Sequence, residues 1–462
     1  MKKLLLVNPY NNPNLKKHWV ESYFPPAFEP LALGIIAALT PIDWEIKIVD
    51  EQIEPFQYIP CDLVGITAST ANINRAYEIA EIIKQYKIPT VLGGVHGTIL
   101  PDEALRYFDT VVTGEAEDIW PQVTDDFNNG KLKRIYNGKR LDVLNVPKAR
   151  RDLFSDKYRY GLIQTSRGCP FNCEFCYSSK YNGHIIRRRP VEEVLDEIET
   201  IKQKKIFFVD DNLFGYSNND FEYTSNLLEG IIKRGINKYW VCQTSINISS
   251  NSKLLKLAYK SGCRLLLIGF EAENKEALNN INKPLNYNTI RKTNMRPYKQ
   301  EIRNIHLAGI CIIGAFIYGI DSDNIESLKN REQFMLKSKL DNIQLTLLVP
   351  NPGTNLYTRL KNENRMLTKN YPQDWNNFVI RKAVFKPKNI SPELLELQIN
   401  RSRYKINKLH RILFRVFRSW YETGSYSAAY ISLYHSIGMK TVFRNKLIKF
   451  AVIFLKRKKF TL

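Results

Sequence analysis

Short apolar runs alternate with helical patterns over the first 120 residues of the chain. The apolar or β-branched runs cover residues 4–7, 44–49, 63–68, 90–92 and 110–113. Between the third and fourth runs, residues 71–87 place isoleucine and alanine at the spacing of an amphipathic helix. Strands that alternate with helices predict a parallel sheet with helices on both faces. We therefore expect a doubly wound α/β domain, Rossmann-like or flavodoxin-like, over residues 1–135.

A second series of apolar runs extends from residue 161 to residue 349. Its six runs cover residues 161–165, 205–209, 239–246, 264–270, 310–318 and 343–349, with helical patterns between them. Six β/α units are fewer than the eight of a closed barrel. The pattern therefore predicts a partial (β/α)6 barrel over residues 155–385. Residues 136–154, which are polar and basic, are interpreted as the interdomain linker.

Residues 386–462 are predicted to form a basic helical extension. One helical face carries Ile406, Leu409, Leu413, Val416, Phe417 and Trp420, with Lys405, Lys408, Arg411, Arg415 and Arg418 largely off it. The formal net charge of the chain is +22, and residues 401–462 contain fifteen Lys/Arg and a single acid, Glu422. Such a segment suits a polyanion or an anionic membrane surface, in whose interface the apolar run 447–455 could lie. Alternatively, these helices pack across the barrel mouth and leave a solvated basic rim.

The composition is that of a folded protein of two or three domains. Of its 462 residues 44% are hydrophobic and 12% aromatic, which is enough for a substantial core. Cys61, Cys242, Cys263 and Cys311 stand singly in apolar surroundings, a pattern typical of a reducing cytoplasm and of core residues. The first ten residues are too short for a secretory signal, and no apolar run approaches the roughly 18 residues of a membrane span. The prediction is a cytoplasmic protein, at most peripheral at the inner face of a membrane.

Three further cysteines, Cys169, Cys173 and Cys176, lie within eight residues after the first barrel run. Three soft thiolate donors this close together indicate a metal site. An iron–sulfur cube with three cysteine ligands leaves one iron open to a ligand that is not protein. A structural zinc site needs a closed shell, and His184 is near enough in sequence to be the fourth ligand. Spacing alone leaves both the cluster and the Cys3His zinc site open.

With Phe175 before the last cysteine and Tyr177 after it, this spacing resembles the signature of radical S-adenosylmethionine (SAM) enzymes. The resemblance implies that the three thiolates hold a [4Fe–4S] cluster whose open iron binds SAM. An electron, supplied by a donor such as flavodoxin or ferredoxin, then cleaves SAM to a 5′-deoxyadenosyl radical.

The segments DLVGITAST, VLGGVHGT and VVTGEAED resemble the cobalamin-binding domain of the cobalamin-dependent radical SAM enzymes. Many such domains carry Asp-x-His-x-x-Gly after the first strand, whereas this chain has Asn8-Pro9-Tyr10-Asn11-Asn12. Lower-face cobalt coordination by that histidine is therefore excluded, although the resemblance still implies cobalamin as a cofactor. The alternative is a domain kept for its fold alone, without a ligand.

Polar residues fall at the carboxyl ends of the predicted barrel strands, where the reactive groups of such barrels lie. Asp210, Asp211 and Asn212 end the second strand, and one of them is also expected to cap the following helix. With the family resemblance, the predicted SAM-binding residues are Phe175, Tyr177, Asp210, Asp211, Asn212, Ser245, Glu271, Gly314 and Gly319.

The loops after the strands of the first domain supply the predicted cobalamin site, because ligands of doubly wound sheets bind beyond the carboxyl ends of the strands. The predicted residues are Asn8, Thr67, Ala68, Ser69, Thr70, Gly93, Gly94, His96, Gly114, Glu115 and Glu117. We interpret His96 as a packing or hydrogen-bonding residue in preference to a cobalt ligand.

The resemblance implies an enzyme that uses cobalamin and SAM, with C-methylation of an unactivated carbon as the first hypothesis. An alternative keeps both cofactors but performs a ring contraction, cyclisation or oxidation without methyl transfer. A zinc- and nucleic-acid-binding module is a remote third reading, and nucleic acid is not the expected partner. The substrate is expected to be a small or lipid-like molecule, and the sequence does not identify it.

Overall fold

The computed structural model describes residues 1–10, 28–141, 145–291 and 297–438; the apolar run 447–455 lies outside them. The chain divides into two compact units. Unit 1 comprises Met1–Phe207 and Val349–Phe385, and unit 2 comprises Phe208–Leu348 and Lys386–Leu462. The cysteine loop therefore shares a compact unit with the first sheet, a grouping that differs from the division predicted in chain order.

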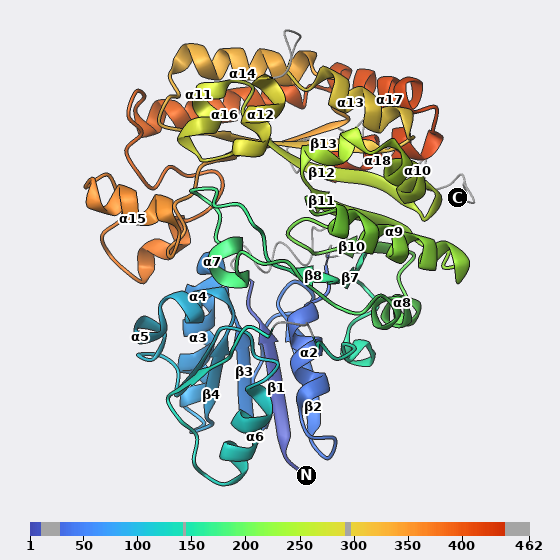
Figure 1. Ribbon diagram of the computed structural model, residues 1–462. Helices are drawn as coiled ribbons and strands as arrows, with labels where there is room; N and C mark the ends of the chain where they lie inside the picture. The colour runs from blue at the N-terminus through green and yellow to red at the C-terminus, as the bar shows by residue number, and fades with distance from the viewer. Residues whose placement is uncertain (11–27, 142–144, 292–296, 439–462) are drawn as a thin grey trace. The chain divides into compact units, whose positions relative to one another are not determined.

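Unit 1 begins with a six-stranded parallel sheet in the order β2-β1-β3-β4-β5-β6 (Figure 1). The strands are β1 (Lys3–Asn8), β2 (Glu45–Asp50), β3 (Leu63–Thr67), β4 (Thr90–Gly93), β5 (Thr110–Thr113) and β6 (Ile135–Asn137). The strand order reverses between β1 and β3, where doubly wound sheets of the flavodoxin-like type form their ligand crevice.

Helices cover both faces of this sheet because successive side chains of its strands alternate between two apolar cores. Leu5 and Val7 of β1 join the core under α3 (Ile73–Lys84), whereas Leu4 and Leu6 face α2 (Leu31–Leu39) and α6 (Trp120–Asn128). Shorter helices, η1 (Thr70–Asn72), α4 (Val95–Ile99) and α5 (Pro101–Ala104), follow β3 and β4. The five predicted strands and the predicted helix are confirmed. The short β6 was missed because it has no apolar run.

The second part of unit 1 surrounds the cysteine loop. It contains η2 (Arg151–Leu153), β7 (Gly161–Ile163), the antiparallel pair β8 (Ser166–Arg167) and β9 (Arg187–Arg188), α7 (Ser178–Asn182), α8 (Val191–Thr200) and most of β10 (Lys205–Phe208). The segment 349–385 returns to this unit with α15 (Asn355–Asn362) and η4 (Gln373–Asn377). Its Trp375, Phe378 and Val384 are buried in the core under α3.

Unit 2 contains the parallel strands β11 (Tyr239–Thr244), β12 (Cys263–Glu271), β13 (Cys311–Tyr318) and β14 (Asn342–Leu347). Between them lie α9 (Asn218–Lys233), η3 (Ile246–Ser250), α10 (Ser252–Lys260), α11 (Lys275–Asn280), α12 (Pro284–Arg291), α13 (Lys299–Leu307) and α14 (Ile325–Lys337). The order of the second sheet, β14-β13-β12-β11-β10-β7, is the chain order of the six predicted barrel strands, so the predicted succession of β/α units is confirmed.

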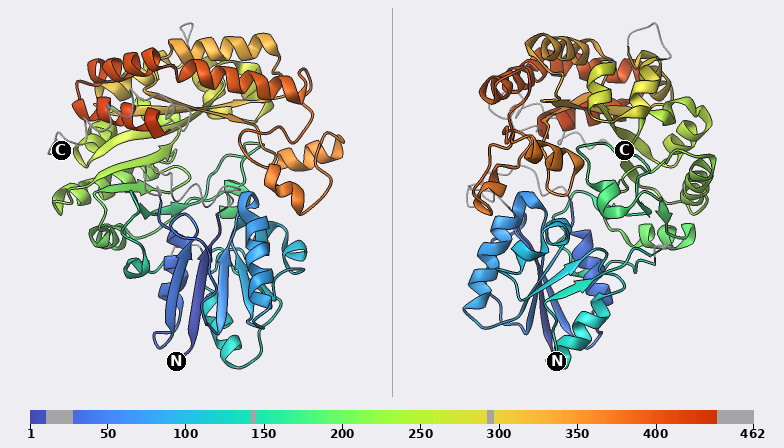
Figure 2. Two further views of the ribbon diagram at one scale, coloured as in Figure 1. Left: turned by 180° about the vertical axis from the view of Figure 1, so that it is seen from behind. Right: turned by 60° about the vertical axis from the view of Figure 1, so that its left-hand side comes forward.

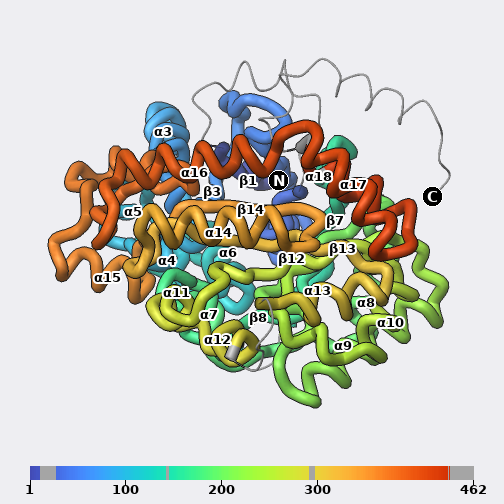
Figure 3. Tube along the Cα trace, turned by 90° about the horizontal axis from the view of Figure 1, so that it is seen from above, coloured from blue at the N-terminus to red at the C-terminus, as the bar shows by residue number. Residues whose placement is uncertain are grey.

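Unit 2 ends with α16 (Pro392–Ile406), α17 (Leu409–Thr423) and α18 (Tyr426–Gly438). Figures 2 and 3 show α16 beside α14 and α17 at the rim of the unit. Ala428 of α18 packs with Leu265, Cys311 and Ile313 near the starts of β12 and β13. Within the described ranges no helix has both the length and the apolar character needed to cross a membrane.

Candidate functional site

The cysteine loop is held at its base by backbone contacts. Cys169 N donates to Gly183 O at 3.1 Å. Gly168 has a φ of +109°, and a Cβ at this position would lie 2.1 Å from the carbonyl oxygen of Ile185. Only glycine fits such a position, so the turn that precedes Cys169 is fixed by the sequence.

The three thiols of this loop are free of disulfide bonds, with Cys173 buried and Cys169 and Cys176 half-buried. In the part of the chain that the structure describes, no group of three or more His, Cys, Asp or Glu is arranged to hold a single metal ion. His184, the candidate zinc ligand, is exposed. Thiolates that bind different irons of one cluster need not converge on a point, as the ligands of a zinc ion must. The donor set therefore fits a cluster.

The segment at the start of α15 clamps the cysteine loop from the side. Arg359 donates to both carboxylate oxygens of Glu174, with 3.0 Å between Nη2 and Oε2. Leu356 N donates to the Glu174 carbonyl at 2.9 Å, and Asn355 Nδ2 donates to Asn172 Oδ1 at 3.2 Å. Sequence reasoning missed this clamp, because Arg359 is 185 positions from Glu174 and belongs to no recognisable motif, although Glu174 lies between Cys173 and Cys176.

Buried ion pairs join the antiparallel pair β8 and β9 to the loop after β5. Arg187 Nη1 donates to Glu115 Oε2 at 2.8 Å, while Arg167 pairs with Glu117 and lies 3.5 Å from Glu115. Burial by itself would raise the pKa of Glu117, but the Arg167 guanidinium outweighs it and holds that pKa below its usual range. The two carboxylates predicted to contact cobalamin thus also anchor the cysteine loop to the sheet.

The loops predicted to bind cobalamin are bonded to one another along the carboxyl edge of the sheet. Ala68 N donates to Gly93 O at 3.1 Å, and His96 N donates to Ala68 O at 3.2 Å. Gly114 N donates to Thr98 Oγ1 at 3.0 Å. The structure therefore brings the ends of β3, β4 and β5 together, as the sequence predicted.

Several polar side chains of this edge are bonded within the protein. Asn8 Nδ2 donates to Asp50 Oδ1 at 3.0 Å, and Tyr158 Oη donates to Asp50 Oδ2 at 2.6 Å. Burial raises the pKa of Asp50. Ser69 is exposed, although its N and Oγ both bond to Asn72 Oδ1. The predicted contacts of Asn8 and Ser69 with cobalamin remain predictions.

His96 is fully buried in a polar network below the edge. Its Nδ1 lies 3.2 Å from Thr70 Oγ1, and its Nε2 lies 3.3 Å from Glu103 Oε1 and 3.5 Å from the Tyr77 hydroxyl. The ring meets that of Trp375 edge-on at 5.5 Å. Because protein groups engage both nitrogens, this geometry supports the hydrogen-bonding interpretation of His96.

Two adjacent glycines show where the edge has room for a ligand. A Cβ at Gly93 would meet nothing within 4 Å, whereas one at Gly94, with a φ of +96°, would lie 2.7 Å from Ala68 O. With Thr67 and Ala68 beside them, these small residues allow the close backbone approach that a large flat ligand needs. The edge therefore fits a corrin.

We expect Gly94→Ala to destabilise unit 1 by about 1–3 kcal/mol, because an alanine there is strained and meets the backbone of Ala68. Gly93→Ala should change the stability by less than about 0.5 kcal/mol, yet weaken cobalamin binding because its methyl group enters the open space. Thermal unfolding of the cobalamin-free protein and a cobalamin titration check the two effects. Equal unfolding temperatures for the two variants would contradict the argument.

The carboxyl ends of β10 and β11 are tied together by Asn212. Its Oδ1 accepts from Thr244 Oγ1 at 2.8 Å and from Ser245 N at 3.2 Å, while its Nδ2 donates to Gly215 O at 3.1 Å. Ser245 Oγ lies 3.0 Å from the Tyr216 hydroxyl. Two predicted SAM-binding residues therefore lie together, with the Asn212 side chain holding the loop.

The expectation that Asp210, Asp211 or Asn212 caps the next helix is wrong. Ser217 caps α9, accepting from Asp220 N while the Asp220 carboxylate accepts from Ser217 N. The three residues lie one loop earlier, and sequence reasoning had no means of placing the start of the helix. Asp210 is fully buried and Asp211 half-buried at the end of β10.

Glu271, the predicted SAM-facing acid of β12, has a φ of +62°. A positive φ is uncommon outside glycine and often marks functional positions. Lys283 Nζ donates to its Oε1 at 3.1 Å, and Asn286 Nδ2 donates to the carbonyls of Gly269 and Phe270 at 3.0 and 3.1 Å. Asn286 of α12 and Lys283, the residue before that helix, thus hold the bulge that presents Glu271.

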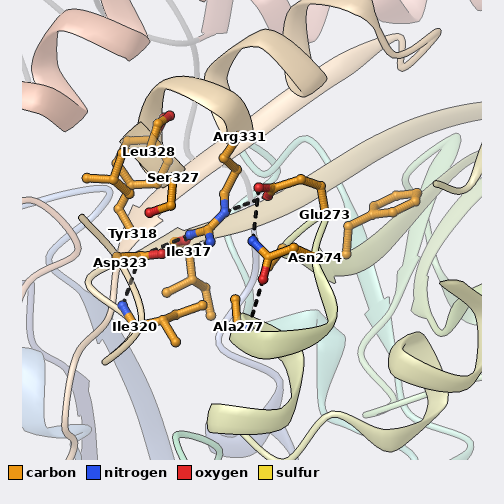
Figure 4. A network of polar contacts seen from close by, with 12 residues as sticks. Glu273, Asn274, Ala277, Ile317, Tyr318, Ile320, Asp323, Ser327, Leu328 and Arg331 are labelled. Carbon is orange, nitrogen blue, oxygen red and sulfur yellow. Dashed lines mark hydrogen bonds and ion pairs between the residues drawn. The ribbon is translucent and has the colours of Figure 1, made fainter. Parts of the chain in front are cut away.

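A buried arginine joins the ends of β12 and β13 (Figure 4). Arg331 of α14 donates to Glu273 Oε2 at 2.8 Å, to both Asp323 carboxylate oxygens at 2.8 and 3.0 Å, and to Ile317 O at 2.6 Å. Asp323 Oδ2 in turn accepts from Gly319 N at 2.9 Å. The ion network therefore fixes the turn that contains Gly319. The sequence did not reveal it.

The remaining predicted SAM-binding residues differ in their surroundings. A Cβ at Gly314 would lie 2.6 Å from Leu340 Cδ1 and near Phe270 and Phe316, so the contacts of Gly314 are with an apolar layer. Phe175 is half-buried and Tyr177 is 39% exposed. These roles stay predictions. The interpretation of Cys242, Cys263 and Cys311 as core residues is confirmed, because all three are fully buried.

Two family models match the chain. The B12 binding domain matches residues 24–124, and the Radical SAM superfamily matches residues 163–335. The two matches follow the order of the first sheet and the barrel strands.

Curated relatives match most of the chain. Bacteriochlorophyllide d C-12(1)-methyltransferase of Chlorobaculum tepidum is 31% identical over 81% of this chain and 82% of its own length. Bacteriochlorophyllide d C-8(2)-methyltransferase of the same organism is 28% identical over 83% and 87%. Among solved structures, the cobalamin-dependent SAM radical enzyme OxsB, with aqua-cobalamin and SAM bound, has a TM-score of 0.68 and 14% identity, covering 99% of this chain and 75% of OxsB. This likeness concerns the fold.

Proposed function

The chain belongs to the cobalamin-dependent radical SAM enzymes, and from this premise we propose that it methylates a carbon atom of a small apolar molecule. It is a methyltransferase that takes a [4Fe–4S] cluster, SAM and cobalamin as cofactors. Two relatives that match about four fifths of its length are named as methyltransferases of bacteriochlorophyllide d, acting at C-12(1) and C-8(2). We extend to this chain only the class of reaction and of substrate.

One observation carries the proposal: within unit 1, the loop of Cys169, Cys173 and Cys176 is tied to the ligand edge of the first sheet. The connection consists of two buried ion pairs, Arg187 with Glu115 and Arg167 with Glu117. Buried charge pairs with this geometry hold their elements at a defined separation, because breaking one leaves an uncompensated charge. These pairs support the proposal that one scaffold holds both the cluster site and the cobalamin site.

The bound cofactors would supply a radical that removes hydrogen from an unactivated carbon and a methyl group to replace it. The residues of the chain bind and orient them. Cys169, Cys173 and Cys176 are proposed to hold the cluster, and the Glu174–Arg359 pair to fix the conformation of their loop. Glu271 and the turn at Gly319 are proposed to contact SAM.

Two partners belong to the proposal. Cleavage of SAM by a cluster consumes an electron, so a donor such as a flavodoxin or ferredoxin is needed. The basic C-terminal region is proposed to meet an anionic membrane surface, where an apolar substrate would be concentrated. The expected location is the cytoplasm, at the inner face of the membrane.

Methyl-labelled SAM tests the function. Oxygen-free protein with reconstituted cluster and cobalamin is incubated with a reductant and bacteriochlorophyllide d as a probe substrate. We expect label on the cobalamin, with S-adenosylhomocysteine formed in equal amount, and both S-adenosylhomocysteine and 5′-deoxyadenosine when a substrate is methylated. Formation of 5′-deoxyadenosine without any S-adenosylhomocysteine would end the methyl-transfer proposal in favour of ring contraction, cyclisation or oxidation.

A further inference from the structure

Helix α17 presents its apolar face to the outside of unit 2. The residues it buries are Ile412, Arg415 and Ser419. The opposite face of α17 is exposed and apolar, and it continues into the first residue of α18. We call this surface the docking stripe; its residues, each between 38% and 78% exposed, are Leu413, Phe414, Phe417, Trp420, Tyr421 and Tyr426. The sequence predicted the amphipathic pattern, and Arg415, one of the basic residues placed off the apolar face, is buried.

The orientation of α17 is fixed by its basic side chains. Arg415 Nη1 donates to Ile406 O at 2.7 Å, and Arg418 Nη2 donates to Leu340 O at 2.6 Å. Burial, together with the neighbouring Arg418 and Arg411, lowers the pKa of Arg415 to about 10. Rotating the apolar face inward would break both hydrogen bonds, so the outward stripe belongs to the folded unit.

Aromatic side chains of the stripe are arranged against one another before anything binds. The rings of Phe417 and Trp420 lie 5.8 Å apart edge-on, and those of Trp420 and Tyr426 lie 5.6 Å apart and stacked. A contiguous exposed patch of this kind marks an interaction surface. Trp and Tyr are the residues enriched where one end of a side chain meets lipid and the other meets water.

Charge decides which partner the stripe fits. Lys408 is exposed at the start of α17, whereas Lys405 of α16 pairs with Glu332 at 2.7 Å. Residues 439–462, which follow α18, contain eight Lys/Arg and no acid. A second copy would bring the same positive charge to the contact and be repelled. An anionic lipid surface supplies the opposite charge and an apolar interior for the rings.

We propose that α17 and the start of α18 dock this protein onto an anionic membrane surface, with the docking stripe in the lipid interface and the basic residues at the headgroups. This inference deepens the partner proposed above and does not depend on methyl transfer, because it concerns binding of the whole protein to lipid.

Sedimentation with vesicles tests the docking surface. The full-length holoprotein is mixed with vesicles of phosphatidylcholine alone or with added phosphatidylglycerol. We expect binding only to the anionic vesicles, weakened by salt. Phe414→Ser/Phe417→Ser should weaken it by at least about tenfold, whereas Ile232→Ser, which changes an exposed apolar residue of α9, should have no effect. Unchanged binding of the double variant would overturn the proposal, because the basic residues alone would then account for the binding to vesicles.

A second measurement places Trp420 in the lipid. Vesicles with brominated acyl chains should quench the tryptophan fluorescence of the wild type, and Trp420→Phe, which keeps the stripe apolar, should bind equally well but lose most of that quenching. Quenching that is the same in both proteins would overturn the proposal. So would a concentration-dependent dimer that the double variant abolishes while no vesicles are bound, which would assign the stripe to a second copy.

Discussion

Replacing Cys169, Cys173 or Cys176 by alanine, one at a time, will reduce bound iron and acid-labile sulfide to background and abolish cleavage of SAM. A cluster with three protein ligands and one open iron keeps only two protein ligands in each variant, and the loop offers no other thiol. The loss of activity should exceed about 10³-fold, since the chemistry of such an enzyme is carried by its cofactors. Iron and sulfide assays on oxygen-free protein, with 5′-deoxyadenosine as the product, check this result.

Cys61→Ser is the matched control. Cys61 is half-buried in unit 1, and burial raises the pKa of its thiol to about 11, so it stays protonated and is no ligand candidate. This variant should keep its iron, sulfide and activity. Wild-type protein that holds one zinc ion and no sulfide would contradict the prediction and would restore the zinc site with His184.

Arg331→Met will destabilise unit 2 by about 3–5 kcal/mol, because it leaves the fully buried Asp323 carboxylate and the nearly buried Glu273 carboxylate without their counter-charge. For a unit of this size the unfolding temperature should fall by roughly 6–20 °C. At temperatures where the variant stays folded, its affinity for SAM should fall on the order of tenfold or more, because the turns around Gly319 and Glu273 lose their common anchor. Thermal unfolding and equilibrium binding of SAM measure the two effects.

Two variants make the Arg331 prediction specific. Arg303→Met removes an exposed arginine of α13 and should alter neither quantity. Arg331→Met/Asp323→Asn removes one of the two orphaned charges, that of the fully buried Asp323, and should recover part of the stability while SAM affinity stays low. If the affinity returns together with the stability, Arg331 acts on stability alone and does not position the SAM loops.

Much of the fold was predictable because its signals are local. Both faces of β1 are buried, and the sequence shows this as four consecutive apolar residues. The isoleucine spacing of α3 gives both the helix and its buried face. The thiol loop was equally visible, since three cysteines and Gly168 are neighbours in the chain. The residue that caps α9 was wrongly predicted because several polar residues before the helix could serve as caps. In the structure the cap is Ser217.

The sequence by itself determined the two kinds of sheet, the family and the three thiols, because each rests on spacing within a short stretch of chain. Only the tertiary structure decided that Arg359 clamps Glu174, that Arg331 joins the turns after β12 and β13, and that α17 turns its aromatic face outward. In each case a charged side chain has a partner far along the chain, and for the fully buried Arg331 the lack of solvent makes the pairing obligatory. A helical pattern shows which residues share a face, whereas the buried partners determine which face is covered.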